Sequence, residues 1–180
     1  MITRLGPKYL SGKTLIVNPK KVLKYRDILL GCSSELLDEA RGLALGSVEN
    51  VVFLETIEHM RDYQSFVIKI RELLKTKGKC ICSAPFLIPR HEEDDYWRFT
   101  VEGLCEVFKK NGFRINEADY YGQFYTTIEE IIRFSWFGHE VKNKWVLRFV
   151  RAMLKISNFF DKRVKNKNVY TNIYVVAEKI

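Results

Sequence analysis

Residues 91–100 read HEEDDYWRFT, and they join two segments with different hydrophobic patterns. The apolar run 79–84 (KCICSA) before them is typical of a buried strand, and Pro85 ends it. After them, apolar residues recur at helical spacing up to Asn111-Gly112, and Thr100 stands where it can cap that helix. The sequence therefore predicts a strand, a polar loop that carries aromatic side chains, and a helix, in this order.

The same alternation continues on both sides of this unit. The run 48–55 (VENVVFLE) predicts a strand buried on both faces, and the helix that follows is capped by Asp62 and ends at Lys77-Gly78. The other predicted elements are a strand over 13–17 (KTLIV), a strand from Phe113, a helix opened by a capping box of Thr127 and Glu130 that runs to about Gly138, a helix over 144–161 and a terminal strand over 170–177. Strands that alternate with helices indicate an α/β fold with a mainly parallel sheet, and we expect the terminal strand to form an antiparallel edge.

Five short motifs follow one another in a fixed order. They are 54–60 (LETIEHM), 74–78 (LKTKG), Pro85-Phe86, the string DYWRFT over 95–100 with Gly103-Leu104 after it, and Asn111-Gly112-Phe113. In this order they resemble the type 11 group of class I S-adenosylmethionine-dependent methyltransferases, over about residues 39–125. The resemblance implies a Rossmann-like methyltransferase sheet with flanking helices, S-adenosylmethionine as the cofactor, and methyl transfer to an acceptor. Family members with this string occur mostly beside cell-surface sugar functions, which implies a glycan-related or other small-molecule acceptor.

The end of the strand 48–55 carries the first group of candidate site residues. Leu54, Glu55 and Thr56 would lie at the carboxyl edge of a parallel sheet, where such folds bind ligands, and the resemblance implies that they contact the cofactor. His59 follows at the same edge. Its imidazole titrates near neutral pH, so we consider two roles for it, a catalytic base near the transferred methyl group or a capping side chain.

The resemblance places three further cofactor-binding residues upstream. Glu39 and Ala40 stand in the turn whose acid meets the adenine amino group in the family. The position of the family's ribose-binding acid falls on Asn18 or, in an alternative alignment, on Asp27.

The polar loop supplies the residues expected to line an acceptor pocket: His91, Tyr96, Trp97 and Arg98. Arg98 suits an acidic acceptor group, because a guanidinium pairs well with carboxylate or phosphate. The alternative is structural, with Trp97 in the core and Arg98 bonded to Asp95.

The N-terminal part departs from the family pattern. A glycine-rich loop should follow the first strand so that the backbone can approach the cofactor, yet no G-x-G sequence occurs. If 13–17 is the first strand, residues 18–21 (NPKK) replace that loop. If 13–17 is the second strand, the first strand and its loop are missing, and the sheet is abbreviated at its N-terminal side.

Composition indicates one folded domain over residues 1–180. The chain is 47% hydrophobic and 29% charged, and it has no linker or repeat. Four cysteines lack metal-ligand spacing, and the acids at 92–95 are typical of a solvated loop, so we predict no metal site. Reduced core thiols and an N-terminus without an apolar run favour a cytoplasmic protein without a signal peptide.

The net charge of +8 comes from one segment. Residues 142–167 hold nine basic residues and one acid, whereas the rest of the chain is neutral. Within the predicted helix 144–161, the basic residues form one stripe opposite a wide apolar face, so we predict a basic amphipathic insertion. Peripheral contact with an anionic membrane, packing on the sheet and a homodimer interface are the alternatives, whereas nucleic-acid binding is disfavoured because aromatic residues do not interleave with the basic stripe.

Three hypotheses about function follow. The first is an S-adenosylmethionine-dependent methyltransferase. The second is a non-catalytic methyltransferase-like module that docks on a partner or a membrane surface. The third is an incomplete reading frame whose upstream part encodes the glycine-rich loop.

Overall fold

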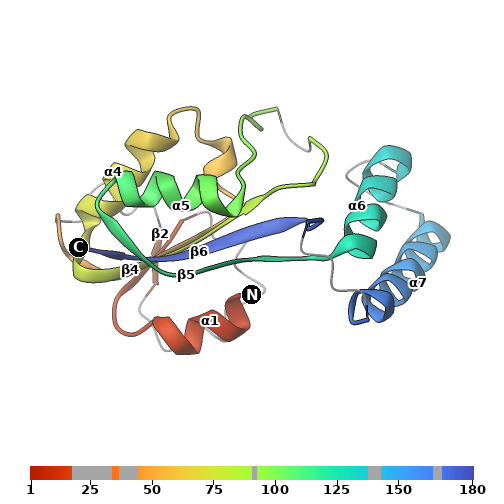
Figure 1. Cartoon of the computed structure of the whole chain (residues 1–180), viewed down its shortest axis with the longest axis horizontal. Coiled ribbons are helices and arrows are strands. Elements are labelled where there is room, and N and C mark those ends of the chain that lie inside the picture. Colours follow the sequence, from red (N-terminus) through yellow and green to blue (C-terminus); the bar gives the residue numbers. More distant parts are fainter. Residues whose placement is uncertain (18–33, 37–43, 91–92, 138–142, 164–167) are drawn as a thin grey trace.

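The computed structural model describes residues 1–17, 34–36, 44–90, 93–137, 143–163 and 168–180. Within these residues, six strands form one sheet in the order β2-β1-β3-β4-β6-β5 (Figure 1). The strands are β1 (Thr14–Val17), β2 (Ser34–Leu36), β3 (Val48–Leu54), β4 (Leu74–Pro85), β5 (Phe113–Tyr121) and β6 (Asn172–Lys179). β1 to β4 are parallel to one another, and β6 runs antiparallel to both β4 and β5. The predicted α/β fold is confirmed, but the terminal strand is not at the edge, because it lies between β4 and β5.

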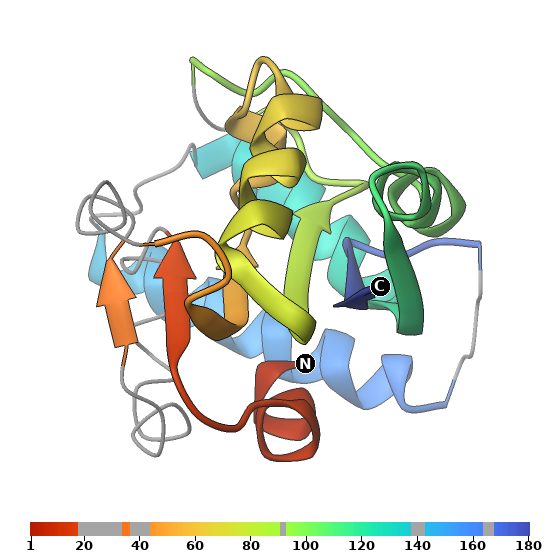
Figure 2. The same ribbon diagram turned by 90° about the vertical axis from the view of Figure 1, so that its left-hand side faces the viewer.

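Helices cover both faces of this sheet. α4 and α5 lie on one face and α1 lies on the other, while α6 and α7 form a pair beyond one end of the sheet (Figures 1 and 2). The described helices are α1 (Ile2–Tyr9), the 3-10 turn η3 (Ile57–His59), α4 (Tyr63–Leu73), α5 (Val101–Lys110), α6 (Phe124–Phe137) and α7 (Lys144–Asp161).

Alternating residues of the central strands separate the core into two layers. Phe53 of β3 is fully buried under α4 and α5, where its ring packs against Phe66 and Phe108 at centroid distances of 5.1 and 6.4 Å. The neighbouring positions Val52 and Leu54 face α1 instead. This two-residue period is the one expected of strands that are covered on both faces.

Local sequence signals place some helix ends correctly. The Asp62 carboxylate accepts a hydrogen bond from the Ser65 amide, and the Thr100 hydroxyl accepts one from the Gly103 amide, so α4 and α5 begin at their predicted caps. The predicted helix over 144–161 coincides with α7.

Other predicted helix ends are wrong. α4 ends at Leu73, because the chain enters β4 at Leu74 and Gly78 lies inside that strand. A Cβ atom at Gly78 would come within 2.7 Å of the Lys75 carbonyl oxygen, so a close backbone approach explains this glycine. α6 begins at Phe124, and the Thr127 hydroxyl donates to the Gln123 carbonyl oxygen instead of opening the helix.

A bulge in β5 turns one acid towards α1. Ile115 pairs with Ala177 and Glu117 pairs with Val176, so Asn116 is an extra residue on β5. The extra residue moves Glu117 to the face that α1 covers.

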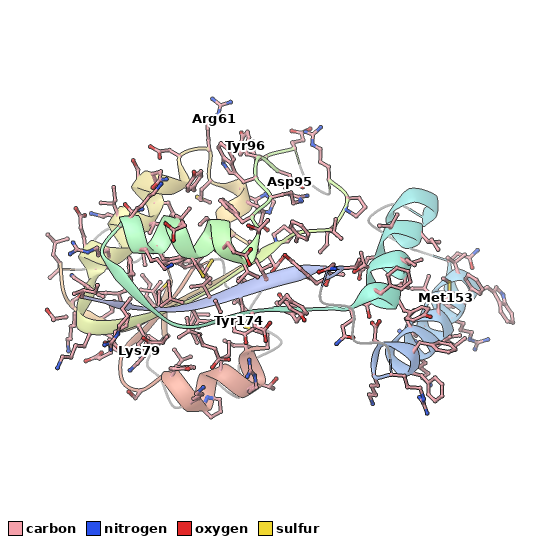
Figure 3. All side chains as sticks on the ribbon, viewed as in Figure 1. Arg61, Lys79, Asp95, Tyr96, Met153 and Tyr174 are labelled. Atoms are coloured by element: carbon pink, nitrogen blue, oxygen red, sulfur yellow. The ribbon has the colours of Figure 1, made fainter. Side chains whose placement is uncertain are left out.

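Glu117 of β5 holds α1 against the sheet through hydrogen bonds and ion pairs. Its carboxylate accepts hydrogen bonds from Lys8 at 2.6 Å and from the hydroxyls of Tyr9 and Tyr174 at 2.9 Å each, and Arg4 pairs with it at 2.7 Å. Tyr174 lies between the sheet and α1 (Figure 3). The hydrogen bonds from Lys8, Tyr174 and Tyr9 and the charge of Arg4 lower the pKa of Glu117 from 4.5 to about 2. The sequence pattern gave no prediction of α1 or of this contact.

Candidate functional site

The candidate site begins where neighbouring strands leave the sheet in opposite directions. From β1 the chain continues to β2 on one side, whereas β3 leads to β4 on the other side. Such a switch point at the carboxyl ends of parallel strands is where open α/β sheets bind ligands. The described residues at this point are Val17, at the end of β1, and Leu54, Glu55 and Thr56, at and after the end of β3.

Glu55 is fixed by three other strands. Its carboxylate accepts hydrogen bonds from the Ser83 hydroxyl at 2.6 Å, the Asn172 amide at 2.8 Å and the Tyr121 hydroxyl at 3.1 Å. Its backbone has a φ of 48°, which L-residues other than glycine, asparagine and aspartate seldom adopt. The Glu55 carboxylate therefore connects β3 with β4, β6 and β5 at this edge, and the Glu55 amide adds a hydrogen bond to the Ser83 carbonyl oxygen at 3.0 Å.

The turn after β3 holds the loop that contains DYWRFT. The Glu58 carbonyl oxygen accepts hydrogen bonds from the amides of Tyr96 and Trp97, at 2.9 and 3.3 Å. The Trp97 indole donates to the Met60 carbonyl oxygen at 2.9 Å, and the His59 imidazole Nδ1 lies 2.7 Å from the Asp94 carbonyl oxygen. Two of the five motifs that carry the family resemblance, the segment 54–60 and the string DYWRFT, are therefore hydrogen-bonded to each other.

His59 has its two ring nitrogens facing different acceptors. A carbonyl oxygen only accepts, so Nδ1 carries a proton towards Asp94. Nε2 lies 3.4 Å from the Glu58 carboxylate, whose side chain is fully buried. An ionised carboxylate also only accepts, so close contact between the two groups requires a proton on one of them. His59 therefore connects the turn after β3 to the loop that contains DYWRFT.

Arg98 is engaged within the same loop. Its guanidinium makes two hydrogen bonds to the buried Asp95 carboxylate, one of them at 2.7 Å, and also donates to the Ile88 carbonyl oxygen at 3.2 and 3.3 Å. The hydrogen bonds to Asp95 raise the pKa of Arg98. The structural alternative for Arg98 is therefore present in the structure.

Two aromatic residues of the loop remain accessible. Tyr96 is 40% exposed and Trp97 is 38% exposed, and the Arg61 guanidinium lies 5.5 Å from the centre of the Tyr96 ring. Figure 3 shows Arg61, Tyr96 and Asp95 on the side of the sheet that α4 and α5 cover. Phe99, by contrast, is buried and packs edge-on against Tyr63 at 5.3 Å.

Several predicted site residues lie outside the described residues, namely Asn18, the alternative Asp27, Glu39, Ala40 and His91. Within the described part of the chain, no group of three or more histidine, cysteine or acidic side chains is arranged to hold a metal ion. No described helix is both long and apolar enough to cross a membrane.

The partners that shape this edge have no local signal in the sequence. Ser83, Tyr121 and Asn172 meet at Glu55 from three strands that are far apart in sequence, so no local pattern points to them. The burial of Glu58 also has no local signal, because an acid in a polar turn is normally solvated.

Comparison with known proteins identifies the fold but no close relative. No model of a known protein family matches the sequence, and no curated protein matches it. A SAM-dependent methyltransferase from Archaeoglobus fulgidus is similar in structure, with 11% identity, a TM-score of 0.59 and coverage of 99% of this chain and 91% of the other. Phosphoethanolamine N-methyltransferase 2 of Haemonchus contortus, in complex with phosphomonomethylethanolamine and S-adenosylhomocysteine, has 14% identity and a TM-score of 0.59 over 99% of this chain and 51% of the other. The [4+2]-cyclase SpnF has 12% identity and a TM-score of 0.58 over 99% and 79%. The chain thus has the Rossmann-like fold of class I methyltransferases, a fold that one of these neighbours uses for another reaction.

Proposed function

We propose that the chain transfers a methyl group from S-adenosylmethionine to a small-molecule acceptor. The observation that carries this proposal is the joining of the two motifs at the switch point, where the DYWRFT loop is hydrogen-bonded to the turn that follows β3. The cofactor and the acceptor must meet at one point, and this unit brings a candidate cofactor edge and a candidate acceptor wall together.

The residues divide into two groups. The backbone of Leu54, Glu55 and Thr56 would support the cofactor, together with Asn18, Glu39 and Ala40. His91, Tyr96, Trp97 and Arg98 would form the acceptor side. The described residues fit this division, since the Glu55 carboxylate is held at the edge by hydrogen bonds to three neighbouring strands and Tyr96 and Trp97 are accessible.

Bound S-adenosylmethionine supplies an electrophilic methyl carbon on its sulfonium. The task of the chain is then to hold the acceptor atom in line with that carbon, because orientation alone accounts for much of the acceleration of such a step. The hydrogen bonds of the Glu55 carboxylate hold the cofactor side in place, and the Arg98–Asp95 ion pair holds the acceptor side in place. Arg98 acts here through Asp95 and the Ile88 carbonyl oxygen, as a residue that shapes the acceptor wall.

We assign His59 a positioning role in place of the catalytic base that the sequence allowed. A base needs an unprotonated nitrogen that faces the acceptor, whereas Nε2 faces the Glu58 carboxylate and Nδ1 faces a carbonyl oxygen. His59→Asn keeps a donor for the Asp94 carbonyl oxygen and removes the imidazole ring. Retention of most of the maximal rate, with an unchanged pH profile, is expected for positioning, and a large loss at neutral pH would show that His59 is the base.

Isothermal titration calorimetry with S-adenosylmethionine and S-adenosylhomocysteine tests the cofactor half of the proposal. We expect both to bind, and methionine and ATP serve as control ligands that share only parts of the cofactor. Absence of binding at millimolar concentration by a folded protein would refute the proposal. The acceptor half is tested with cofactor carrying a radioactive methyl group and a panel of sugars and nucleotide sugars, in which a labelled product is the expected result.

One observation favours a second function. If 13–17 is the first strand, residues 18–21 (NPKK) place a proline and two lysines where the family has glycines that let the backbone approach the cofactor. A non-catalytic module of this fold is the conclusion if neither cofactor form binds. The two functions are therefore separated by the same titration.

A further inference from the structure

The helical pair α6–α7 is set apart from the rest of the molecule. Figure 1 shows the two helices side by side beyond the end of β5 and β6, away from α4, α5 and α1. α7 packs on α6 through a narrow buried side that includes Val150, Ser157 and Asp161. Most of the described side chains of α7 are therefore exposed, the apolar ones as well as the basic ones.

The uncovered part of α7 carries large apolar side chains. They recur at spacings of three, four and seven residues, so they form one stripe along the helix. Their exposed fractions are 73% for Trp145, 53% for Phe149, 58% for Ile156, 52% for Phe159 and 40% for Phe160. Exposed apolar patches of this kind mark interaction sites on soluble proteins.

A stripe of basic residues runs beside the apolar stripe. It consists of Lys144, Arg148, Arg151 and Lys155, and Lys162 continues it directly after the end of α7; all five residues are exposed. The Arg148 guanidinium lies 5.0 Å from the centre of the Trp145 ring, and that of Arg163 lies 3.7 Å from the centre of the Phe159 ring. The charges therefore sit next to the apolar side chains instead of on the opposite side.

The one acid in residues 142–167 does not reduce this charge at the surface. Asp161 is buried, and its carboxylate accepts hydrogen bonds from the backbone amides of Tyr125 and Thr126 at 2.9 and 3.1 Å. It thus caps the start of α6, where a helix favours negative charge. What α7 presents outwards is cationic and apolar.

We propose that this face of α7, defined by the apolar and basic stripes above, docks on an anionic membrane surface. An interfacial helix needs apolar side chains that enter the acyl boundary and adjacent cations that meet the lipid headgroups, and both are present here. A second copy of the chain fits less well, because it would bring two strongly cationic faces together. Nucleic acid would use the cations but would leave residues such as Ile156 exposed to water. This inference is independent of the proposed methyl transfer, since docking requires no cofactor.

Vesicle flotation with the full chain tests the proposal. The probes are vesicles of phosphatidylcholine alone and vesicles of phosphatidylcholine in which about one lipid in three is the anionic phosphatidylglycerol. We expect binding to the anionic vesicles that weakens in high salt, and little binding to the neutral ones. Two variants separate the contributions: Trp145→Ser with Phe149→Ser removes apolar side chains, and Arg151→Gln with Lys155→Gln removes charge.

The charge variant and a matched control have defined expectations. Each basic residue near an anionic surface contributes roughly a five-fold factor, so the charge variant should bind about 30-fold more weakly. Lys109→Gln with Lys110→Gln, the matched control on the exposed side of α5, should leave binding within about two-fold of the original. Circular dichroism checks that all variants are folded, which their exposed positions favour.

Three results would overturn the proposal. The first is no flotation of the original protein with anionic vesicles. The second is equal loss of binding in the α5 control, which would mean that net charge alone is responsible. The third is a dimer by analytical ultracentrifugation that the Trp145→Ser, Phe149→Ser variant converts to a monomer while vesicle binding stays unchanged.

Discussion

The contact between α1 and the sheet should depend on pH through Glu117. The pKa of Glu117 is lowered from 4.5 to about 2, because Lys8, Tyr174 and Tyr9 donate to its carboxylate and Arg4 adds positive charge. A lowered pKa means that the unfolded chain binds the proton more tightly than the folded one. The stabilisation is therefore complete above pH 4.5 and is lost as the pH falls towards 2.

The size of the effect follows from the same shift. The fall of the Glu117 pKa from 4.5 to about 2 corresponds to a stabilisation of the folded state of about 3 kcal/mol as an upper limit. The Arg4 and Lys8 side chains are 60% and 56% exposed, so solvent screening lowers our expectation to about 1–2 kcal/mol. Glu117→Gln should therefore unfold about 1–2 kcal/mol more easily at pH 7, and the difference from the original protein should shrink between pH 4.5 and pH 2.

Urea unfolding followed by circular dichroism at pH 7, 5 and 3 measures this difference. Glu106→Gln is the matched control, because Glu106 pairs with Lys109 on the exposed surface of α5 and its loss should change stability little. The reasoning about Glu117 is refuted if Glu117→Gln unfolds like the original protein at pH 7, or if the gap between them widens in acid.

Three further substitutions test other parts of the fold. Gly122→Ala should destabilise the protein by well over 1 kcal/mol, because Gly122 has a φ of +72° and the added Cβ would lie 1.9 Å from the Thr171 hydroxyl. Gly46→Ala is the control in the same urea assay, because Gly46 has a similar φ but nothing lies within 4 Å of the added Cβ. Phe53→Ala should cost about 3–5 kcal/mol, since its ring is fully buried, and a loss below about 1 kcal/mol would show that the ring is not part of the core. Asp161→Ala should lower stability by about 1–2 kcal/mol and reduce the helical signal in circular dichroism, whereas an unchanged signal would contradict its role as the cap of α6.

The elements that the sequence predicts well are those whose signals are local. The caps Asp62 and Thr100 and the apolar run ending at Leu54 each act within a few residues, so the starts of α4 and α5 and the position of β3 follow directly. The start of α6 could not be predicted in this way, because its cap is Asp161, the last residue of α7, which follows α6 in the sequence. Gly78 misleads for the opposite reason, since a glycine that ends a helix and a glycine that allows close strand contact look alike in sequence.

The residues of the candidate site also differ in whether a local sequence signal points to them. His59, Tyr96 and Trp97 could be selected because each belongs to a motif with a recognisable order, and the structure brings them together through backbone hydrogen bonds. The carboxylates of Glu55 and Glu58 gain their surroundings from strands and loops that only the folded chain assembles. Charged groups are therefore the least predictable part of this edge, because burial decides what they do.

The extra residue in β5 also bears on how the molecules behave towards one another. β5 is the edge of the sheet beyond β6, and an exposed edge strand is a template on which a strand of another molecule can pair and start aggregation. The bulge at Asn116 interrupts the regular row of backbone donors and acceptors, and Glu117 places a charge beside it. The irregularity that lets β5 hold α1 thus also makes the open side of the sheet a poor partner for self-association.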